Sequence, residues 1–219
     1  IIGRRKTPDE IDSAYEAYNV GEHLILYRDP VADPEKYWER SIKLDKHMIP
    51  AYLSLAESRI RRGLYDEAEK LLDDATVLRD EFNQRPESGK IHYLYGLCYQ
   101  RQGRYDDAYD AFRKAMWSYD KVSAAATKAS ALALRRRDWK DARALAGMAY
   151  ESDNSNSAAV IRMLLADYRL HDDAAVKADI ALLSEEKLNM TYAWALVSVG
   201  MADEGEFFAR LQSPPSQTV

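Results

Sequence analysis

The chain has 219 residues, of which 47% are hydrophobic and 31% charged, and its net charge is −5. This suffices for one large domain or two small ones. The low content of glycine and proline, 9 and 7 residues, argues against a turn-rich β fold and against a disordered chain. No apolar run is long enough to span a membrane, and the negative net charge disfavours nucleic-acid binding. No secretory leader is visible. We therefore expect a cytoplasmic protein that binds neither membranes nor nucleic acid.

The first predicted elements form a helix pair in residues 1–48. Thr7-Pro8-Asp9-Glu10 is a capping box with proline at the first helical position, which predicts a helix running from there toward Tyr27. Asp33-Pro34-Glu35 is a second helix start, and apolar residues follow it at helical spacing.

Residues 89–122 contain the clearest repeat. An apolar stripe from Ile91 to Tyr99 has the spacing of one helix face, and Gly103 then ends the helix. A second apolar stripe runs from Tyr105 to Met116. This pattern predicts a helix, a tight turn and an antiparallel helix.

The same unit recurs on both sides, where Ala68, Ala108 and Ala142 occupy equivalent places. The last two are separated by about 34 residues, a period typical of helical repeats. Six extra residues precede Ala108 in the stretch Asp80–Lys90, and we expect that stretch to leave the repeat array as a loop or a helix extension. The predicted organisation is an N-terminal pair, four repeats, a degenerate C-terminal pair with Gly200 at its turn, and a flexible tail, over residues 1–48, 49–88, 89–122, 123–156, 157–185, 186–212 and 213–219.

Small residues recur in pairs at a constant interval: Ala56 with Ala68, Gly96 with Ala108, and Ser130 with Ala142. Two helices that cross closely need small side chains at the crossing. Together with the period, these residues resemble the tetratricopeptide repeat, whose pattern reads here His92-x2-Tyr95-Gly96-x2-Tyr99 and then Ala108-x3-Phe112. The resemblance implies an all-α, right-handed α-solenoid of about six antiparallel helix pairs.

A narrower resemblance covers about Thr7 to Glu185. Gly21-Glu22-His23, Tyr27-Arg28-Asp29-Pro30, the spacer near Pro86 and the segment Tyr105–Tyr119 are similar to a bacterial group. In that group a repeat array follows a β-sandwich region of unknown function that looks like the aldose-epimerase fold. The resemblance implies that this chain is the back half of a larger, carbohydrate-related protein whose active site lies elsewhere.

The residues offer no catalytic constellation. The four histidines share no spacing, and no cluster has metal-ligand spacing. Cys98 lies on an apolar stripe, where a buried small hydrophobe is the default. Two of the three acidic pairs, Asp106-Asp107 and Asp172-Asp173, stand at predicted helix starts, where the helix dipole explains them. We therefore expect no enzyme, no cofactor and no metal.

Four arginines form the one constellation above background. They stand just before the predicted turns, at the end of the first helix of each pair, and their intervals are those of the repeats themselves: Arg61, Arg101, Arg135 and Arg169. In a tetratricopeptide superhelix the first helices line the concave groove, so these side chains would grip carboxylates there. The competing interpretation is that each only stabilises the end of its helix dipole.

Further residues are expected on the same groove: Leu53, Tyr93, Leu97, Lys128, Arg162 and Tyr168. Such a lining predicts a non-enzymatic interaction module for an acidic peptide or a partner domain. Tyr93 and Leu97 would instead pack against the next repeat if the groove is not used. The alternative function is a structural or dimerisation arm of a larger protein, and the sequence leaves a homo-oligomer open.

Overall fold

The computed structural model describes residues 6–82 and 88–182. These residues form α-helices and two short 3-10 turns, and the described part contains no strand. The chain divides into two compact units, one ending at Lys121 and the other beginning at Val122. The all-α prediction is confirmed, and each unit is described by itself below.

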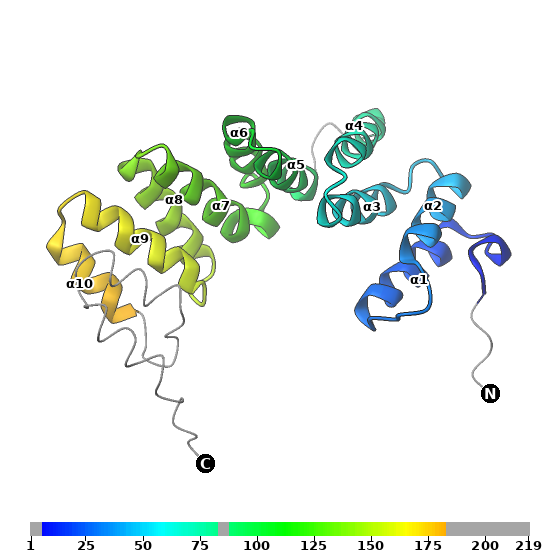
Figure 1. Ribbon diagram of the computed structural model, residues 1–219, viewed down its shortest axis with the longest axis horizontal. Helices are drawn as coiled ribbons and strands as arrows, with labels where there is room; N and C mark the ends of the chain where they lie inside the picture. The colour runs from blue at the N-terminus through cyan, green and yellow to red at the C-terminus, as the bar shows by residue number, and fades with distance from the viewer. Residues whose placement is uncertain (1–5, 83–87, 183–219) are drawn as a thin grey trace, which may run out of the picture. The chain divides into compact units, whose positions relative to one another are not determined.

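The first unit holds three antiparallel helix pairs, coloured blue to green in Figure 1. Consecutive helices pack against each other within each pair, and the first helices α3 and α5 of neighbouring repeats also touch. The bounds are α1(Ala14–Leu26), α2(Pro34–Leu44), α3(Ile49–Arg61), α4(Tyr65–Phe82), α5(Lys90–Arg101) and α6(Tyr105–Ala115), with 3-10 turns at Pro8–Glu10 and Tyr119–Lys121.

The described part of the second unit, residues 122–182, holds two pairs, in which α7 packs on α8 and α9 on α10, while α8 also packs on α9. Its core is built largely from alanine, with Leu145 and Leu164 as its largest fully buried side chains. The bounds are α7(Val122–Arg135), α8(Trp139–Ser152), α9(Ser157–Arg169) and α10(Asp173–Leu182).

The turn inside each repeat uses one left-handed residue. Gly63 and Gly103 have φ of 79°, and Arg137 and His171 have φ of 61° and 60°. In all four turns the next residue donates its N–H to a carbonyl five residues earlier, as Arg104 does to Tyr99 at 2.9 Å. This Schellman cap satisfies carbonyls at the helix end. The turns predicted at these four positions are therefore confirmed.

The prediction of one helix from Thr7 to Tyr27 is wrong. Thr7 does form the predicted capping box, but only a 3-10 turn, Pro8–Glu10, follows it. Ile11 then adopts an extended backbone and is fully buried. The helix restarts behind Ser13, whose hydroxyl accepts the N–H of Glu16 at 3.3 Å. Burial of Ile11 against the α1–α2 pair outweighs one continuous helix.

A glycine meets an aromatic ring at two helix crossings of the first unit. A Cβ placed on Gly96 would lie 2.5 Å from Cε1 of Phe112, so only glycine fits under that ring. Gly21 of α1 lies in the same way under the indole of Trp38, which is 1% exposed. The sequence predicts Ala108 opposite Gly96. The ring that covers Gly96 belongs instead to Phe112, one helical turn further along α6.

Part of the expected spacer is a helix extension. Helix α4 continues to Phe82 and is the longest described helix, at 18 residues. Its neighbour α5 starts at Lys90. Residues 83–87 lie outside the described part, as do the predicted C-terminal pair at 186–212 and the tail at 213–219.

Candidate functional site: the first-helix faces

The first helix of each repeat ends on an arginine. Helices α3, α5, α7 and α9 have as their last residues Arg61, Arg101, Arg135 and Arg169. Each lies two residues before the left-handed residue of its turn, and all four side chains are exposed. We call the side of these helices that carries the arginines the first-helix face of each unit.

In the first unit this face is mixed in charge. Arg61 lies 3.4 Å from a carboxylate oxygen of Glu57, one turn earlier on α3. The other oxygen of Glu57 lies 3.7 Å from Nζ of Lys90 on α5. Arg101 makes no ion pair with any described residue. Glu57 is not among the residues predicted from the sequence, although its position four residues before Arg61 is the signal for such a pair.

The apolar residues expected on this face are more buried than a groove floor would be. Leu53 is 8% exposed and belongs to the core between α3, α4 and α5, and Leu97 packs on that same core. The ring of Tyr93 lies against Phe112, with 5.7 Å between the ring centroids. Burial and the charge of Glu57 raise the pKa of Tyr93. Its phenol is therefore neutral at pH 7 and is a hydrogen-bond donor at the rim.

In the second unit the arginine of α9 is stacked on aromatic rings. The guanidinium carbon of Arg169 lies 5.7 Å from the ring centroid of Tyr168 and 5.8 Å from that of Trp139. The Tyr168 contact lies within the repeat of Arg169, whereas the Trp139 contact joins α9 to α8 of the preceding repeat. The planar guanidinium keeps N–H donors at its edge while its face is covered, so stacking orients the group without consuming its hydrogen bonds.

Two more basic residues of the second unit lie one stripe back from the helix ends. Lys128 and Arg162 each precede the terminal arginine of their helix by seven residues, which returns to nearly the same helix side. Arg162 donates to the carbonyl of Ala158 at 2.6 Å, and burial lowers its pKa. This places two basic stripes, on α7 and α9, in the second unit.

The remaining sequence candidates have structural partners. Asp73 accepts the hydroxyl of Tyr95 at 2.5 Å, and Asp172 caps α10 by accepting the N–H of Ala175 at 3.0 Å. Cys98 is buried, and burial raises the pKa of its thiol to about 11.

Within residues 6–82 and 88–182, no group of three metal-ligating side chains gathers. No helix among those residues is long and apolar enough to cross a membrane.

The described residues thus form antiparallel helix pairs, and each of the four repeat turns contains one left-handed residue. The tetratricopeptide repeat family matches residues 48–121, the segment from α3 through α6. Residues 48–121 are thus similar to tetratricopeptide repeats, and the all-helical fold of the described residues agrees with that similarity.

Several solved structures share the fold at low sequence identity. PilF of Pseudomonas aeruginosa is 13% identical with a TM-score of 0.74, covering 94% of this chain and 93% of that one. PilW, a type IV pilus biogenesis factor, is 17% identical with a TM-score of 0.68, covering 91% and 92%. YrrB, a tetratricopeptide protein with an unusual peptide-binding site, is 11% identical with a TM-score of 0.59, covering 92% and 93%. These similarities establish the fold.

Proposed function

We propose that the protein is a non-enzymatic scaffold that binds an acidic peptide segment of a partner on its first-helix faces. The observation that carries the proposal is the arginine at the last position of every first helix from α3 to α9. Stabilising the helix dipole requires a basic residue only somewhere in the last turn of a helix. These four arginines instead all lie two residues before the left-handed residue of the turn that follows.

The contacts of two of these arginines support a role beyond capping. Arg101 is unpaired among the described residues, and Arg61 has a single exposed contact at 3.4 Å. An exposed pair of that kind contributes little to stability. A partner carboxylate could therefore displace it at low cost and form two parallel bonds with the guanidinium.

The mixed charge of the first unit limits which peptides fit. Glu57 lies between Arg61 and Lys90, so a carboxylate placed beside Arg61 must avoid it. In the second unit Arg169 is held by aromatic rings, so a carboxylate can reach its N–H donors without displacing an acidic neighbour. Arg162 adds a second positive charge on the same stripe of α9. We therefore expect the second unit to contribute more of the affinity for an acidic segment.

The test uses a fluorescein-labelled eight-residue peptide of alternating glutamate and leucine. Fluorescence anisotropy should show binding that weakens with salt, because exposed charges are screened beyond about 8–10 Å at ordinary ionic strength. Arg101→Ala and Arg135→Ala should each weaken binding about three- to tenfold, less than the effect of a hydrogen bond to a charge in a dry site.

The matched control is Arg136→Ala, which removes a neighbouring exposed arginine outside the repeated register. Circular dichroism should show that all three variants remain folded. The proposal fails if Arg136→Ala weakens the peptide as much as Arg135→Ala, or if the arginine variants lose stability while peptide affinity stays unchanged.

A second candidate function is a structural or dimerisation arm of a larger, carbohydrate-related protein. The observation that favours it lies at the end of α1, where Leu26, Tyr27 and Val31 are 71%, 75% and 90% exposed. A solenoid end needs a polar face to stay soluble alone, and clustered apolar residues mark contact surfaces. Multi-angle light scattering of the protein and of Leu26→Lys with Val31→Lys tests it. A monomeric parent at about 100 μM would rule out a dimerisation arm.

A further inference from the structure

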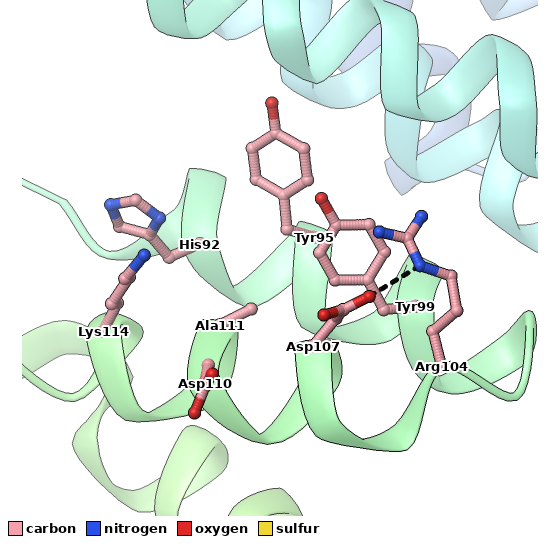
Figure 2. Close-up of a pocket in the computed structure, with 8 residues that line it drawn as sticks. All are labelled: His92, Tyr95, Tyr99, Arg104, Asp107, Asp110, Ala111 and Lys114. Atoms are coloured by element: carbon pink, nitrogen blue, oxygen red, sulfur yellow. Dashed lines mark hydrogen bonds and ion pairs between the residues drawn. The ribbon is translucent and has the colours of Figure 1, made fainter.

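A hollow lies on the other side of α5 from the first-helix face. Tyr93, Leu97 and Arg101 follow one stripe of α5 at intervals of four residues. At about 100° per residue, the side chains of His92, Tyr95 and Tyr99 fall on the opposite side. Together with side chains of α6 and of the turn before it, these three line a hollow of about 310 Å³, shown in Figure 2.

One end of the hollow is saturated by internal contacts. Arg104 binds Asp107 at 2.8 Å and Glu69 of α4 at 3.1 Å, and its guanidinium lies 4.0 Å from the ring centroid of Tyr99. The Asp107 contact is the dashed line in Figure 2. These contacts close the hollow at this end and brace α4 against α6.

The other end holds basic groups with donors to spare. Figure 2 shows the imidazole of His92 beside the ammonium of Lys114, and neither forms a hydrogen bond or ion pair with a described residue. Burial, followed by the charges of Arg79 and Lys114, lowers the pKa of His92. Its ring is therefore neutral at pH 7, with one N–H to donate.

Arg79 of α4 adds a second positive group near this end, beside Lys114. Its Nη2 lies 2.8 Å from Asp80, whereas its buried Nη1 has no partner among the described residues. The ion pair offsets the charge of Asp80, the acidic group that acts to raise the pKa of His92. Lys114 and the unpartnered Nη1 of Arg79 therefore offer positive charge and N–H donors to an anion at this end.

The space between the two ends is aromatic and shallow. Tyr95 and Tyr99 lie with their ring centroids 5.6 Å apart, and the small side chain of Ala111 leaves room opposite them (Figure 2). His92 and Tyr99 are seven residues apart on α5, about 10 Å along the helix. An anion at the His92 end thus lies about a Debye length from the acidic groups that bind Arg104.

We propose that this hollow is a second peptide-docking site, which takes an acidic residue followed by an aromatic residue of a partner protein. The acidic carboxylate accepts hydrogen bonds from Lys114 and His92, and the ring packs on Tyr95 and Tyr99 above Ala111. This assignment is supported by the volume of the hollow, by the unpartnered donors of Lys114 and His92, and by the two tyrosine rings that line it. The site is independent of the arginines on the first-helix face.

One acidic side chain of the hollow should weaken binding of this ligand, so substitutions in the hollow should change the affinity in opposite directions. Asp110 stands one helical turn before Lys114 on α6 and lines the hollow. It competes with the ligand for the Lys114 ammonium and repels its carboxylate. Removing the Asp110 charge should therefore strengthen binding, whereas removing the Lys114 charge should weaken it.

The experiment is a two-dimensional NMR titration of the full chain with the blocked dipeptide acetyl-Glu-Phe-amide. Shifts should map to His92, Tyr95, Tyr99 and Lys114. Acetyl-Gln-Phe-amide and acetyl-Glu-Ala-amide should each bind at least about fivefold more weakly. Lys114→Gln should weaken acetyl-Glu-Phe-amide about tenfold, the equivalent of one hydrogen bond to a charged group, and Asp110→Asn should strengthen it about threefold.

Controls separate this site from the first-helix face. Lys70→Gln, at an exposed lysine on α4 outside the hollow, should leave the titration unchanged, and so should Arg101→Ala. Ala111→Leu fills the hollow and should abolish the shifts. The site is refuted if no residue shifts at about 10 mM dipeptide, if Lys114→Gln has no effect, or if the shifts map to Tyr93 and Arg101, which would assign the dipeptide to the first-helix face.

Discussion

The two units build the same helix pairs from different materials. The first unit uses glycine at its repeat turns and places glycine under large rings at its crossings. The second unit uses Arg137 and His171 in the left-handed turns and fills its crossings with alanine. Tight ring-on-glycine packing tolerates no added volume, whereas the left-handed arginine and histidine carry backbone strain. The turns of α3–α4 and α5–α6 in the first unit are therefore free of this strain, although Arg28 after α1 has φ of 50°, and the first unit is sensitive to added volume at its crossings.

Buried carboxyl groups sharpen the contrast. Glu35 of the first unit is 6% exposed and binds Ser58, Arg59 and Arg62 around the end of α3 at 2.7–2.8 Å. Burial acts to raise the pKa of Glu35, but the hydrogen bonds from Ser58 and Arg62 and the charges of both arginines outweigh it, so the pKa lies below its usual value. The structure thus stabilises the charged form of Glu35.

The second unit stabilises the neutral form of its buried carboxyl. Asp179 of α10 is 2% exposed and lies against Asp167 of α9, which also binds Arg143 of α8 at 2.6 Å, and one carboxyl oxygen of Asp179 has no hydrogen-bond partner among the described residues. Burial, the bond to Asp167 and its charge raise the pKa of Asp179 to about 7. Two carboxyl groups joined by a hydrogen bond need one proton between them. The two units should therefore respond to pH in opposite directions.

The largest expected effect is the substitution Gly96→Leu in the first unit. The branched side chain would overlap the ring of Phe112, and overpacking in a rigid core should cost about 3 kcal/mol or more. Hydrogen exchange of peptides from α5 and α6 should lose protection, while peptides from α7–α9 keep theirs. A variant that melts like the parent would contradict the assigned crossing.

A matched pair isolates the crossing from helix propensity. Gly96→Ala and Gly147→Ala both replace a helical glycine, which favours the helix by up to about 1 kcal/mol. At Gly147 the new Cβ would approach only the end of the Arg143 side chain, at 3.0 Å. We expect Gly96→Ala to destabilise and Gly147→Ala to be neutral or stabilising. Equal effects would show that the ring contact is unimportant.

The second prediction concerns Asp179 and pH. Its folded pKa is raised above the unfolded value, so the folded state holds the proton more tightly. This stabilisation is complete below about pH 4 and is lost as pH rises toward about 7. Asp179→Asn, which needs no proton, should stabilise the second unit by about 2 kcal/mol at pH 8 and by about a quarter of that at pH 4.5.

Hydrogen exchange of α9 at the two pH values measures this difference. Asp173→Asn is the control, because that aspartate of the same helix as Asp179 is exposed. Equal stabilisation by Asp179→Asn at pH 8 and pH 4.5 would show that Asp179 does not hold a proton in the folded state.

The third prediction is the opposite acid response of the first unit. The folded pKa of Glu35 lies below its unfolded value, so its stabilisation is present above about pH 4.5 and is lost as pH falls further. Glu35→Gln should cost about 2 kcal/mol at pH 7, because a largely buried arginine loses its charged partner. That arginine is Arg59, whose side chain is 16% exposed. The variant should also flatten the acid limb of denaturant unfolding followed by first-unit peptides.

Glu39 provides the matched control for Glu35. It contacts the same Arg59 at 3.3 Å, but its side chain is 53% exposed. Glu39→Gln should change stability by less than about 0.5 kcal/mol. If both glutamine variants behave alike, burial of Glu35 is not what makes its ion pairs strong.

Local rules in the sequence account for the parts that could be predicted. The helical spacing of apolar residues predicted the helix pairs. The position of Gly103, two residues after Arg101, predicted a left-handed turn, and Arg137 and His171 occupy the equivalent left-handed positions in the second unit without being glycine. Close crossing required a small residue at Gly96. Each of these depends on residues within one or two turns of a helix, so spacing alone reveals them.

Contacts between helices could not be predicted in the same way. Glu35 meets Arg59 and Arg62 from a neighbouring helix pair, and Asp179 meets Asp167 within a repeat whose register the sequence leaves open. The side chain that covers Gly96 is set by the direction in which the Phe112 ring points, and the spacing of residues along the sequence does not give that direction. The hollow beside His92 likewise depends on how α5 and α6 face each other, and it was not predicted from the sequence. Long-range pairing follows from helix rotation and side-chain direction, which a single sequence does not encode locally.

The smallest effect tests the turns. Arg137 has φ of 61°, a conformation that costs a residue with a Cβ about 1 kcal/mol and glycine almost nothing. Part of that gain is offset because glycine raises the entropy of the unfolded chain, so Arg137→Gly should stabilise the second unit by about 0.5 kcal/mol and raise its midpoint in urea.

The reciprocal change, Gly103→Ala in the first unit, meets no atom within 4 Å and so reports backbone strain alone. It should destabilise by about 1 kcal/mol. If Arg137→Gly destabilises instead, the Arg137 side chain makes a contact that outweighs the strain, and the second unit's turns are then as well optimised as those of the first.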